Sequence, residues 1–435
     1  YYMKALRFIY DTYGEGAAVH DVANTLNNLG LTYNSMMKYD KANFFYQQAL
    51  SVYQQIAQDA DTIDIQLASK LYNLGINYSG LKKYDEAEDF YLKALAVYRQ
   101  FSQGADDVHI ANILNNLGIN HSDMKQYDKA EVCYRQALTM YREISQGDDS
   151  VGIGNTLNNL GNNYRETKQY DKAEDFYQQA LKVYSKVSQS PESVSGVART
   201  LRILGDVHHE TAQFKRAEDY YQQALTEYRE IAHGADSVAI GNTLYNLGEN
   251  FWAMEEYTNA VDYFKQALSI YRVLSPGADT VNIANILYKL GINHGATKHY
   301  AEAEDCHLQA LLIYSQLTSG AAYTDSIIAS ILNFLGNNYN DMNLYDKATD
   351  YYLQALSAYW KMSQGDDSVY SANVLSNLGL NYLEAGDHLK AREAQKQALA
   401  IFARFDPQNP QIKFLDYHLH RSLKNILMTK NSIAH

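Results

Sequence analysis

The sequence predicts an all-α protein in which nine similar helical hairpins stack in a line. The first observation is a Leu-Gly pair that recurs nine times at intervals of 43 to 45 residues, from Leu29-Gly30 to Leu378-Gly379. The second is an Ala-Leu pair whose leucine follows each of those glycines by 20 residues, from Ala49-Leu50 to Ala398-Leu399. All variation in length therefore falls between one Ala-Leu pair and the next Leu-Gly pair. This is the pattern of a repeated supersecondary unit.

Each repeat contains two sets of residues with helical spacing, which the fourth repeat illustrates. The first set has the spacing i, i+3, i+4, i+7 and predicts one face of a first helix: Leu157, Leu160, Gly161 and Tyr164. The second set predicts a second helix: Ala173, Tyr177, Ala180, Leu181 and Tyr184. The short polar segment 166–169 between them predicts a turn, so the two helices form an antiparallel hairpin.

The glycine of the Leu-Gly pair, the signature glycine, predicts close packing. Glycine inside a helix costs up to about 1 kcal/mol relative to alanine. Its presence at one place in nine repeats predicts a neighbouring backbone that approaches too closely for a β-carbon. The first helix of each repeat also opens with alanine or glycine, such as Ala111 or Gly154. We therefore expect both small sites to be contact points between helices.

The N-terminal residues match the interior of a repeat. Residues 1–6 align with residues 351–356, which lie within a predicted second helix. We therefore expect residues 1–20 to be the second helix of a truncated N-terminal repeat. A solenoid needs capped ends for solubility, so we also expect an upstream domain in the same polypeptide.

The C-terminal residues depart from the repeat pattern. Nine complete repeats occupy residues 21–405, and residues 406–435 lack the Leu-Gly pair. Within the last segment, leucines at helical spacing predict an amphipathic helix over 414–428. We expect this C-terminal helix to cap the stack.

Composition and charge narrow the class of partner. The formal net charge is −13, which disfavours nucleic acid or an anionic membrane as the main partner. No 18-residue apolar run predicts a membrane span, and no signal-peptide pattern is present. Cys133 and Cys306 occupy the same position of distant repeats, so they cannot pair with each other. We expect them to be reduced core residues of a cytoplasmic protein.

The sequence contains no motif that predicts catalysis, a cofactor or a metal. A Walker-type loop, a G-x-S-x-G elbow and an H-E-x-x-H helix are all missing. His294, His299, Cys306 and His307 could be taken for zinc ligands, but their spacing fits no ligand pair on one helical face. His121, His208 and His294 stand where other repeats have tyrosine, which favours a role in the core. We therefore expect a non-enzymatic protein.

The repeat resembles the tetratricopeptide repeat (TPR). The resemblance rests on Leu, Gly and Tyr in the first helix and on Ala, an aromatic residue and Ala in the second. The long period is similar to that of kinesin light chain, of nephrocystin-type proteins and of the C-terminal arrays of STAND-type signalling NTPases. The resemblance implies a right-handed α-solenoid of nine complete TPR hairpins, with a partial N-terminal repeat and a C-terminal capping helix. It also implies that the first helices line a concave groove.

Asparagine recurs at three positions of the first helix, although it is a mediocre helix former. Two residues before the signature glycine stand Asn28, Asn73, Asn116, Asn159, Asn246 and Asn377. Six residues before it stand Asn24, Asn112, Asn155, Asn242, Asn285 and Asn373. Two residues after it stand Asn77, Asn120, Asn163, Asn250, Asn293, Asn338 and Asn381.

Two interpretations of these asparagines stay open at this point. In TPR arrays, asparagines resembling these bind the backbone of an extended peptide. Alternatively, the amides bond to the adjacent first helix and only stitch the stack, an interpretation favoured for the position after the glycine. The candidate partner-binding asparagines are Asn112, Asn116, Asn155, Asn159, Asn242 and Asn246.

Four cations interrupt or flank these positions: Arg165, Arg199, Arg202 and Lys289. Guanidinium groups bind carboxylate or phosphate groups bidentately, so these residues predict an anchor for an acidic or phosphorylated ligand. The alternative is that Glu166, Asp206 and Glu210 neutralise them locally.

The function that the sequence favours is protein–protein interaction, with a groove that captures a protein segment or the surface of a target protein. The resemblance to STAND-type proteins implies the ligand-sensing arm of a larger multidomain signalling protein. The alternative is a cargo or scaffold adaptor similar to kinesin light chain.

Overall fold

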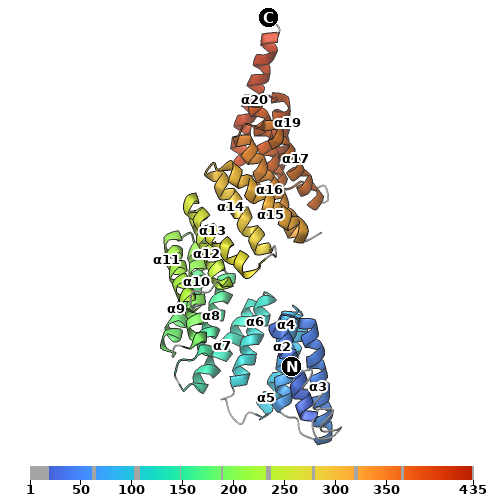
Figure 1. Ribbon diagram of the computed structural model, residues 1–435, viewed down its shortest axis with the longest axis vertical. Helices are drawn as coiled ribbons and strands as arrows, with labels where there is room; N and C mark the ends of the chain where they lie inside the picture. The colour runs from blue at the N-terminus through green and yellow to red at the C-terminus, as the bar shows by residue number, and fades with distance from the viewer. Residues whose placement is uncertain are drawn as a thin grey trace. The chain divides into compact units, whose positions relative to one another are not determined.

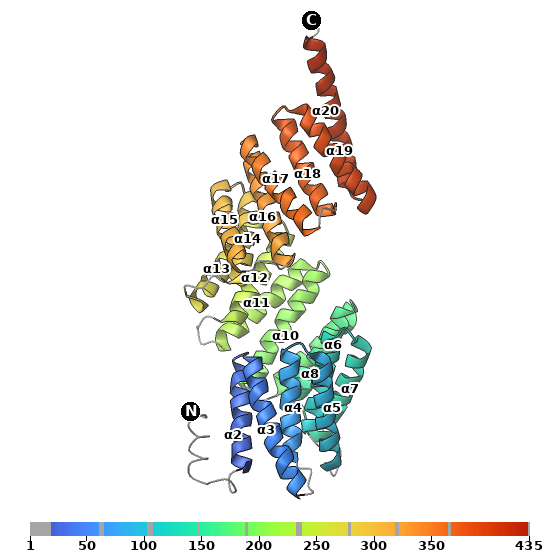
Figure 2. The same ribbon diagram turned by 90° about the vertical axis from the view of Figure 1, so that its right-hand side faces the viewer.

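A computed structural model describes residues 19–60, 65–101, 108–146, 148–187, 190–231, 237–276, 280–317, 322–363 and 367–433. All regular secondary structure in these ranges is helical, as Figures 1 and 2 show. The chain divides into two compact units, Tyr1–Ile231 and Ala232–His435.

The first unit holds repeats one to five as antiparallel helix pairs. The helices are α2 (Val19–Ser35), α3 (Tyr39–Ala60), α4 (Ile65–Gly80), α5 (Tyr84–Phe101), α6 (Val108–Asp123), α7 (Tyr127–Ile144), α8 (Val151–Glu166), α9 (Tyr170–Lys186), α10 (Pro191–Glu210) and α11 (Phe214–Ile231). Each helix packs on the one before it, and each first helix also contacts the next first helix.

The second unit holds repeats six to nine and one further helix. The helices are α12 (Val238–Ala253), α13 (Tyr257–Leu274), α14 (Val281–Ala296), α15 (Tyr300–Leu317), α16 (Ala322–Asp341), α17 (Tyr345–Met362), α18 (Val369–Glu384), α19 (His388–Phe405) and α20 (Gln411–Ile433). The predicted all-α solenoid of helical hairpins is confirmed for the described part of the chain.

The turn of each hairpin depends on one residue in the left-handed region. In repeat four this residue is Lys168, with φ of 58°. Its N–H donates to the carbonyl of Arg165 over 2.8 Å, and the next N–H, of Gln169, donates to Tyr164 over 2.8 Å. These bonds satisfy carbonyls at the end of α8 and turn the chain sharply into α9. The equivalent residues are Met37, Lys82, Lys125, Ala212, Glu255, Lys298, Asn343 and Gly386.

The signature glycine faces a side chain, so the predicted close backbone approach was wrong. A β-carbon on Gly161 would lie 2.5 Å from the ring of Tyr177, which comes from the second helix of the same repeat. Eight of the nine signature glycines meet a ring in this way, and Gly379 meets the side chain of Gln395. The glycine is needed because the ring lies across the first helix.

In six hairpins a ring of the first helix also stacks on a ring of the second helix. The ring centroids are 5.2 to 5.4 Å apart, and the ring planes are within 18° of parallel. The pairs are Tyr33–Phe45, Tyr78–Phe90, Tyr164–Phe176, His208–Tyr220, Phe251–Tyr263 and Tyr339–Tyr351. His121, His208 and His294 occupy the first-helix position of this pair and are all buried, which confirms their predicted place in the core.

The predicted ends agree with the structure in part. The C-terminal helix begins at Gln411, before its predicted start at Phe414, and it packs on α19. Leu415 is fully buried, and the Ser422 hydroxyl donates to the side-chain oxygen of Gln395 over 3.1 Å. The truncated repeat was predicted over residues 1–20; residues 1–18 lie outside the described residues, and the last two, Val19 and His20, already belong to α2.

Candidate functional site

The first helices of repeats three to five carry seven of the ten predicted site residues. Asn112 and Asn116 lie on α6, Asn155, Asn159 and Arg165 on α8, and Arg199 and Arg202 on α10. These helices contact one another within the first unit. The surface that these seven residues form is called the α6–α8–α10 face below. The other three, Asn242 and Asn246 on α12 and Lys289 on α14, lie in the second unit.

Two hollows open between α6 and α8. One has a volume of about 370 Å³, and Asn112, Asn115 and Asn155 line it. The other has a volume of about 510 Å³, and its lining includes Asn159 and Arg165. Four of the predicted residues therefore border concave surface.

The asparagines six residues before the glycine use their amide oxygen to accept a hydrogen bond from a tyrosine of their own repeat. The Asn155 Oδ1 atom accepts a hydrogen bond from the Tyr184 hydroxyl over 2.7 Å and another from the Arg199 guanidinium over 2.7 Å. Since a guanidinium can only donate, this contact fixes which way the amide points. The same tyrosine–asparagine bond forms in Tyr53–Asn24, Tyr141–Asn112, Tyr271–Asn242 and Tyr314–Asn285.

The amide nitrogen of this set remains available. Within the ranges that the structure describes, no hydrogen bond uses the Nδ2 group of Asn112, Asn155 or Asn242. Asn112 and Asn155 are half-buried and border the smaller hollow. Each therefore presents a hydrogen-bond donor at that hollow.

The asparagines two residues before the glycine use their amide nitrogen for internal hydrogen bonds and leave the amide oxygen available. The Asn159 Nδ2 group donates to Asn115 on the preceding first helix over 3.0 Å, and Asn116 donates to the Tyr72 hydroxyl over 2.8 Å. The oxygens of Asn116 and Asn159 have no partner among the described residues. The same contact recurs in Asn73–Asn27 and Asn377–Asn333. Asn246 is half-buried at this position of α12.

The asparagines two residues after the glycine are buried, and Asn120, Asn163 and Asn381 donate to the main chain of the preceding repeat. Asn163 donates to the main-chain oxygen of Tyr127 over 3.0 Å, and Asn120 donates to that of Tyr84 over 2.9 Å. Both side chains are at most 2% exposed. These amides therefore stitch the stack, as favoured for this position from the sequence, but their acceptors lie on the preceding second helix and not on the adjacent first helix.

Three of the four predicted cations are neutralised by carboxylates of the same unit. The Arg165 Nε atom donates to both carboxylate oxygens of Glu210, over 3.0 and 3.2 Å. Arg202 pairs with Asp206 over 3.0 Å. Burial raises the pKa of Asp206, and the two arginines beside it oppose this. Local neutralisation, by Asp206 and Glu210 but not by Glu166, therefore replaces the predicted anchor at Arg165 and Arg202.

Lys289 is also neutralised, in the second unit. Its ammonium group lies 2.7 Å from a Glu249 carboxylate oxygen and 5.0 Å from the ring centroid of Trp252. An ammonium held by a carboxylate and an aromatic ring has little charge left for a ligand. The predicted anchor at Lys289 is therefore replaced by an internal contact.

Arg199 differs from the other three cations. Its side chain is exposed, and its Nη2 group binds the Asn155 oxygen and, over 3.4 Å, the Tyr184 hydroxyl. It forms no ion pair with any residue that the structure describes. The remaining guanidinium edges can therefore bind an anion bidentately.

At the position three residues before the signature glycine, sequence reasoning singled out Arg202 but missed the hydrogen-bonding residues of the other repeats. Asn115 accepts the bond from Asn159, and Asn158 forms a buried contact of 2.7 Å with the Thr200 hydroxyl. This position holds Asn27, Tyr72, Asn115, Asn158 and Arg202 in the first five repeats. Its signal is weak because the residue type changes while the ability to hydrogen-bond persists.

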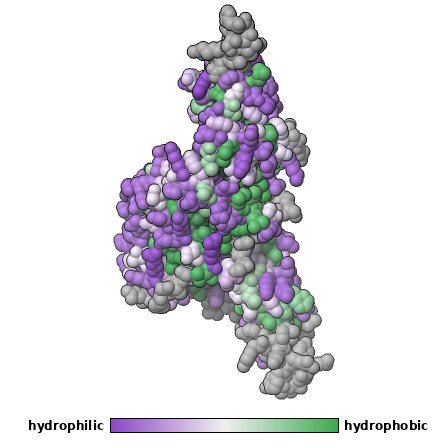
Figure 3. All heavy atoms as spheres, turned by 45° about the horizontal axis from the view of Figure 1, so that its top comes forward, coloured by the Kyte–Doolittle hydropathy of each residue, from purple (hydrophilic) through white to green (hydrophobic). Residues whose placement is uncertain are grey.

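The described residues contain no group of three side chains that could hold a metal ion. No described helix is long and apolar enough to cross a membrane. Cys133 and Cys306 are free, half-buried thiols, and Cys133 packs against the core of the first unit. Hydrophilic residues cover much of the face drawn in Figure 3, with hydrophobic residues between them.

Comparison with family models identifies the repeat. Models described as tetratricopeptide repeat match residues 22–61, 66–143, 110–186, 158–230, 196–273, 240–316 and 327–404. The chain belongs to the tetratricopeptide repeat family. Its repeats are those of a protein-interaction module, and the resemblance inferred from the sequence is confirmed. No curated protein matches the chain.

Solved structures share the fold at low identity. A STAND protein (signal transduction ATPase with numerous domains) with a TPR sensor, from Pyrococcus horikoshii, is 12% identical with a TM-score of 0.61. The match covers 89% of this chain and 53% of that one, so the chain spans about half the length of the STAND protein. The apo quorum sensor NprR from B. thuringiensis is 13% identical with a TM-score of 0.54, covering 82% and 96% of the two chains. A putative kinesin light chain from Podosopora anserina is 16% identical with a TM-score of 0.41, covering 50% and 99%.

Proposed function

We propose that the α6–α8–α10 face binds an extended segment of another protein. The observation that carries this proposal is that each asparagine amide uses one of its two polar atoms for a bond within the stack and leaves the other available. Repeats three and four each keep one donor, at Asn112 and Asn155, and one acceptor, at Asn116 and Asn159. An extended backbone offers one N–H and one C=O per residue, which are the complementary groups. Because the internal bonds already orient the amides, binding costs little side-chain ordering.

Arg199 supplies the anchor in this proposal. Its exposed guanidinium is the cation of the predicted set that no carboxylate of the described chain neutralises. A carboxylate or phosphate on the bound segment would form a bidentate pair with it. The partner is therefore a segment with an acidic or phosphorylated residue, and repeats four and five bind that residue.

The wider role that we propose is the ligand-sensing arm of a larger, STAND-like signalling protein in the cytoplasm, without catalysis of its own. The fold shared with the TPR-sensor STAND protein over 89% of this chain supports this role. The fold shared with NprR, a quorum sensor, supports it as well. The sequence upstream of Tyr1 tests it, because a nucleotide-binding domain is expected there and a heptad coiled coil would instead indicate an adaptor.

An isosteric substitution tests the groove without disturbing the stack. Asn112→Asp and Asn155→Asp keep the oxygen that accepts from Tyr141 and Tyr184, and they replace the outward donor by an acceptor. At position 155 the new carboxylate also pairs with the Arg199 guanidinium, so Asn112→Asp is measured alone as well. Peptides are first selected from a random display library with the full chain. Their dissociation constants are then measured by fluorescence anisotropy. We expect the double variant to bind at least about tenfold more weakly, since two hydrogen bonds of about 1 kcal/mol each are lost.

The control makes the same chemical change on another surface. Gln136→Glu with Gln223→Glu also converts two amides to carboxylates, on exposed positions of α7 and α11. This variant is expected to bind with unchanged affinity, whereas Arg199→Ala is expected to weaken only peptides that contain an acidic or phosphorylated residue. Equal binding by the Asn112/Asn155 variant and wild type would show that the face is not the site.

A further inference from the structure

Repeats three and seven lack the second-helix ring of the stacked pair that closes six other hairpins. Cysteine takes the place of that ring, as Cys133 and Cys306, and histidine takes the first-helix position, as His121 and His294. Repeat five shows that histidine alone is compatible with the stack, because His208 and Tyr220 have centroids 5.2 Å apart and planes 2° from parallel. The missing ring is therefore due to the cysteine.

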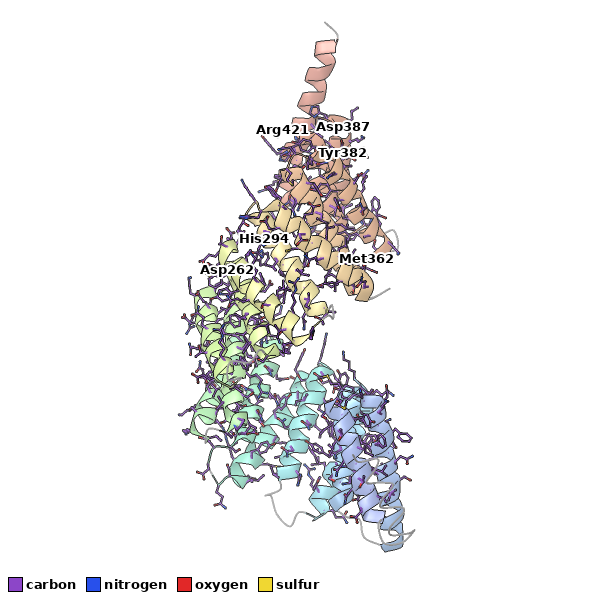
Figure 4. All side chains as sticks on the ribbon, viewed as in Figure 1. Asp262, His294, Met362, Tyr382, Asp387 and Arg421 are labelled. Atoms are coloured by element: carbon purple, nitrogen blue, oxygen red, sulfur yellow. The ribbon has the colours of Figure 1, made fainter. Side chains whose placement is uncertain are left out.

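In repeat seven the missing ring coincides with a hollow of about 570 Å³ between α13, α14 and α15. Cys306 and His294 line it, and so do three leucines: Leu268, Leu287 and Leu290. All three leucines are at least nine-tenths buried. Figure 4 labels His294, which α14 contributes. The hollow is called the α13–α15 pocket below.

The interior of the pocket is uncharged at neutral pH. Burial lowers the pKa of His294, and the nearby Lys265 ammonium lowers it further. Burial raises the pKa of the Cys306 thiol to about 11. The His294 ring meets His299 edge-on, with centroids 6.0 Å apart, and no aromatic side chain of α15 stacks on it. A neutral floor with an imidazole ring suits an aromatic guest.

The residues that line the pocket carry a net positive charge, although the chain as a whole is acidic and Glu302, outside the lining, acts on His294 and Cys306 as a further negative charge. Lys265 and Arg272 border the pocket, and neither forms an ion pair with a described residue. Arg272 donates to the Gln309 side-chain oxygen over 3.3 Å, and the nitrogen of Gln309 donates to Asp305 over 2.7 Å. Asp305 is thus the one carboxylate in the lining, against two cations. Beside them Val273 is 61% exposed.

We infer that the α13–α15 pocket receives an aromatic side chain of a partner protein, with acidic residues beside that side chain contacting Lys265 and Arg272. The guest ring fills the volume that a tyrosine or phenylalanine of the second helix occupies in other repeats, and it stacks on His294. The charge of the rim selects carboxylates, because an acidic segment gains attraction where a basic one meets repulsion. This site shares no residue with the α6–α8–α10 face, so either proposal can fail without the other.

The thiols provide a direct test in the unmodified full-length chain. The probe is a blocked peptide of sequence Asp-Glu-Trp-Asp-Glu, and the measurement is the rate of alkylation of each cysteine by iodoacetamide, followed by mass spectrometry. At saturating peptide we expect alkylation of Cys306 to slow at least fivefold, while Cys133 reacts at an unchanged rate. Peptides with Ala in place of Trp, or Lys in place of the acidic residues, are expected to protect neither thiol.

Substitution of Cys306 distinguishes binding in the pocket from binding elsewhere on the surface. Cys306→Tyr recreates the His–Tyr pair of repeat five and fills the pocket, so a labelled acidic Trp peptide should bind at least tenfold more weakly in fluorescence anisotropy. Cys133→Tyr makes the same change in repeat three and should leave binding unchanged. Thermal unfolding checks that both variants fold. Lys265→Glu with Arg272→Glu removes the positive rim without a core change and should also weaken binding tenfold.

Three outcomes would overturn the inference. They are unchanged binding to Cys306→Tyr or to the charge-reversed variant, equal protection of Cys133 and Cys306, and no binding of the acidic Trp peptide at millimolar concentration. If Cys306→Tyr does not fold, the charge-reversed variant and the protection of the thiol decide the matter.

Discussion

His307 provides the sharpest test of how the repeats are stabilised. It occupies the position whose ring lies across the signature glycine, where most repeats have tyrosine and repeat six has Phe264. Its side chain is fully buried, and neither ring nitrogen has a hydrogen-bond partner. Two aromatic rings surround it, those of Tyr288 and Phe334, with centroids 6.2 and 6.0 Å away. We therefore expect His307→Phe to stabilise the second unit by about 2 kcal/mol at neutral pH, because unsatisfied buried polar groups cost about 1–3 kcal/mol each.

The same residue predicts a pH dependence whose sign follows from the direction of its shift. Burial lowers the pKa of His307 from its ordinary value of 6.5 to about 4. The unfolded chain therefore takes up a proton at this residue at higher pH than the folded chain does. The contribution of neutral His307 to the free energy of unfolding is complete above pH 6.5, and it is lost as the pH falls toward 4. From these two pKa values, wild type loses about 2 kcal/mol through His307 between pH 7.5 and pH 5.

Urea titrations of the full chain at pH 7.5 and pH 5, followed by circular dichroism, measure both effects. His307→Phe should raise the free energy of unfolding at pH 7.5, and its loss on going to pH 5 should be smaller than that of wild type by about 2 kcal/mol. His420→Phe changes a side chain that is 73% exposed and should have neither effect. A variant that loses as much stability as wild type between the two pH values would refute the reasoning.

Three further substitutions test individual contacts by thermal or urea unfolding. Gly161→Ala should cost about 1–3 kcal/mol, since its β-carbon would overlap the Tyr177 ring at 2.5 Å, and no change would mean that the ring shifts freely. Lys168→Gly should gain about 1 kcal/mol, because Lys168 has φ of 58° where repeat nine uses Gly386, and a loss would contradict the turn geometry. Asn163→Ala should cost about 1–3 kcal/mol by leaving a main-chain oxygen of α7 without its buried donor, and a neutral result would mean that another donor replaces it.

The hairpins could be predicted from the sequence because their signal is periodic. Leu157 and Leu160 have counterparts in all eight other repeats, and the position of Tyr164 holds Tyr, His or Phe in each of them, so chance agreement is negligible. The role of Gly161 was predicted only in part. The spacing shows that something lies close to the helix, but the sequence does not say whether it is a backbone or the ring of a residue 16 positions later.

The division of each amide could not be predicted, because it depends on contacts between different repeats. Asn159 donates to Asn115, which lies 44 residues earlier, while Asn155 accepts from a tyrosine 29 residues later. Of the two alternatives that the sequence left open, stitching describes the internal end of each amide, and the binding that we propose concerns the other end. Likewise Arg165 pairs with Glu210, which lies 45 residues later. The sequence offered Glu166, Asp206 and Glu210 as carboxylates that neutralise the arginines, and only the structure assigns Glu210 to Arg165.

The two proposed sites arise from the repeat in different ways. The α6–α8–α10 face uses what the repeats share: the asparagines recur, so affinity accumulates from similar contacts along the stack. The α13–α15 pocket uses a departure from the repeat, since Cys306 removes a ring that six hairpins keep. A shared contact suits recognition of a backbone, which is the same in every protein, whereas a departure occurs once and can select a particular side chain. A partner that engages both would be held by its backbone at one site and distinguished by an aromatic residue at the other.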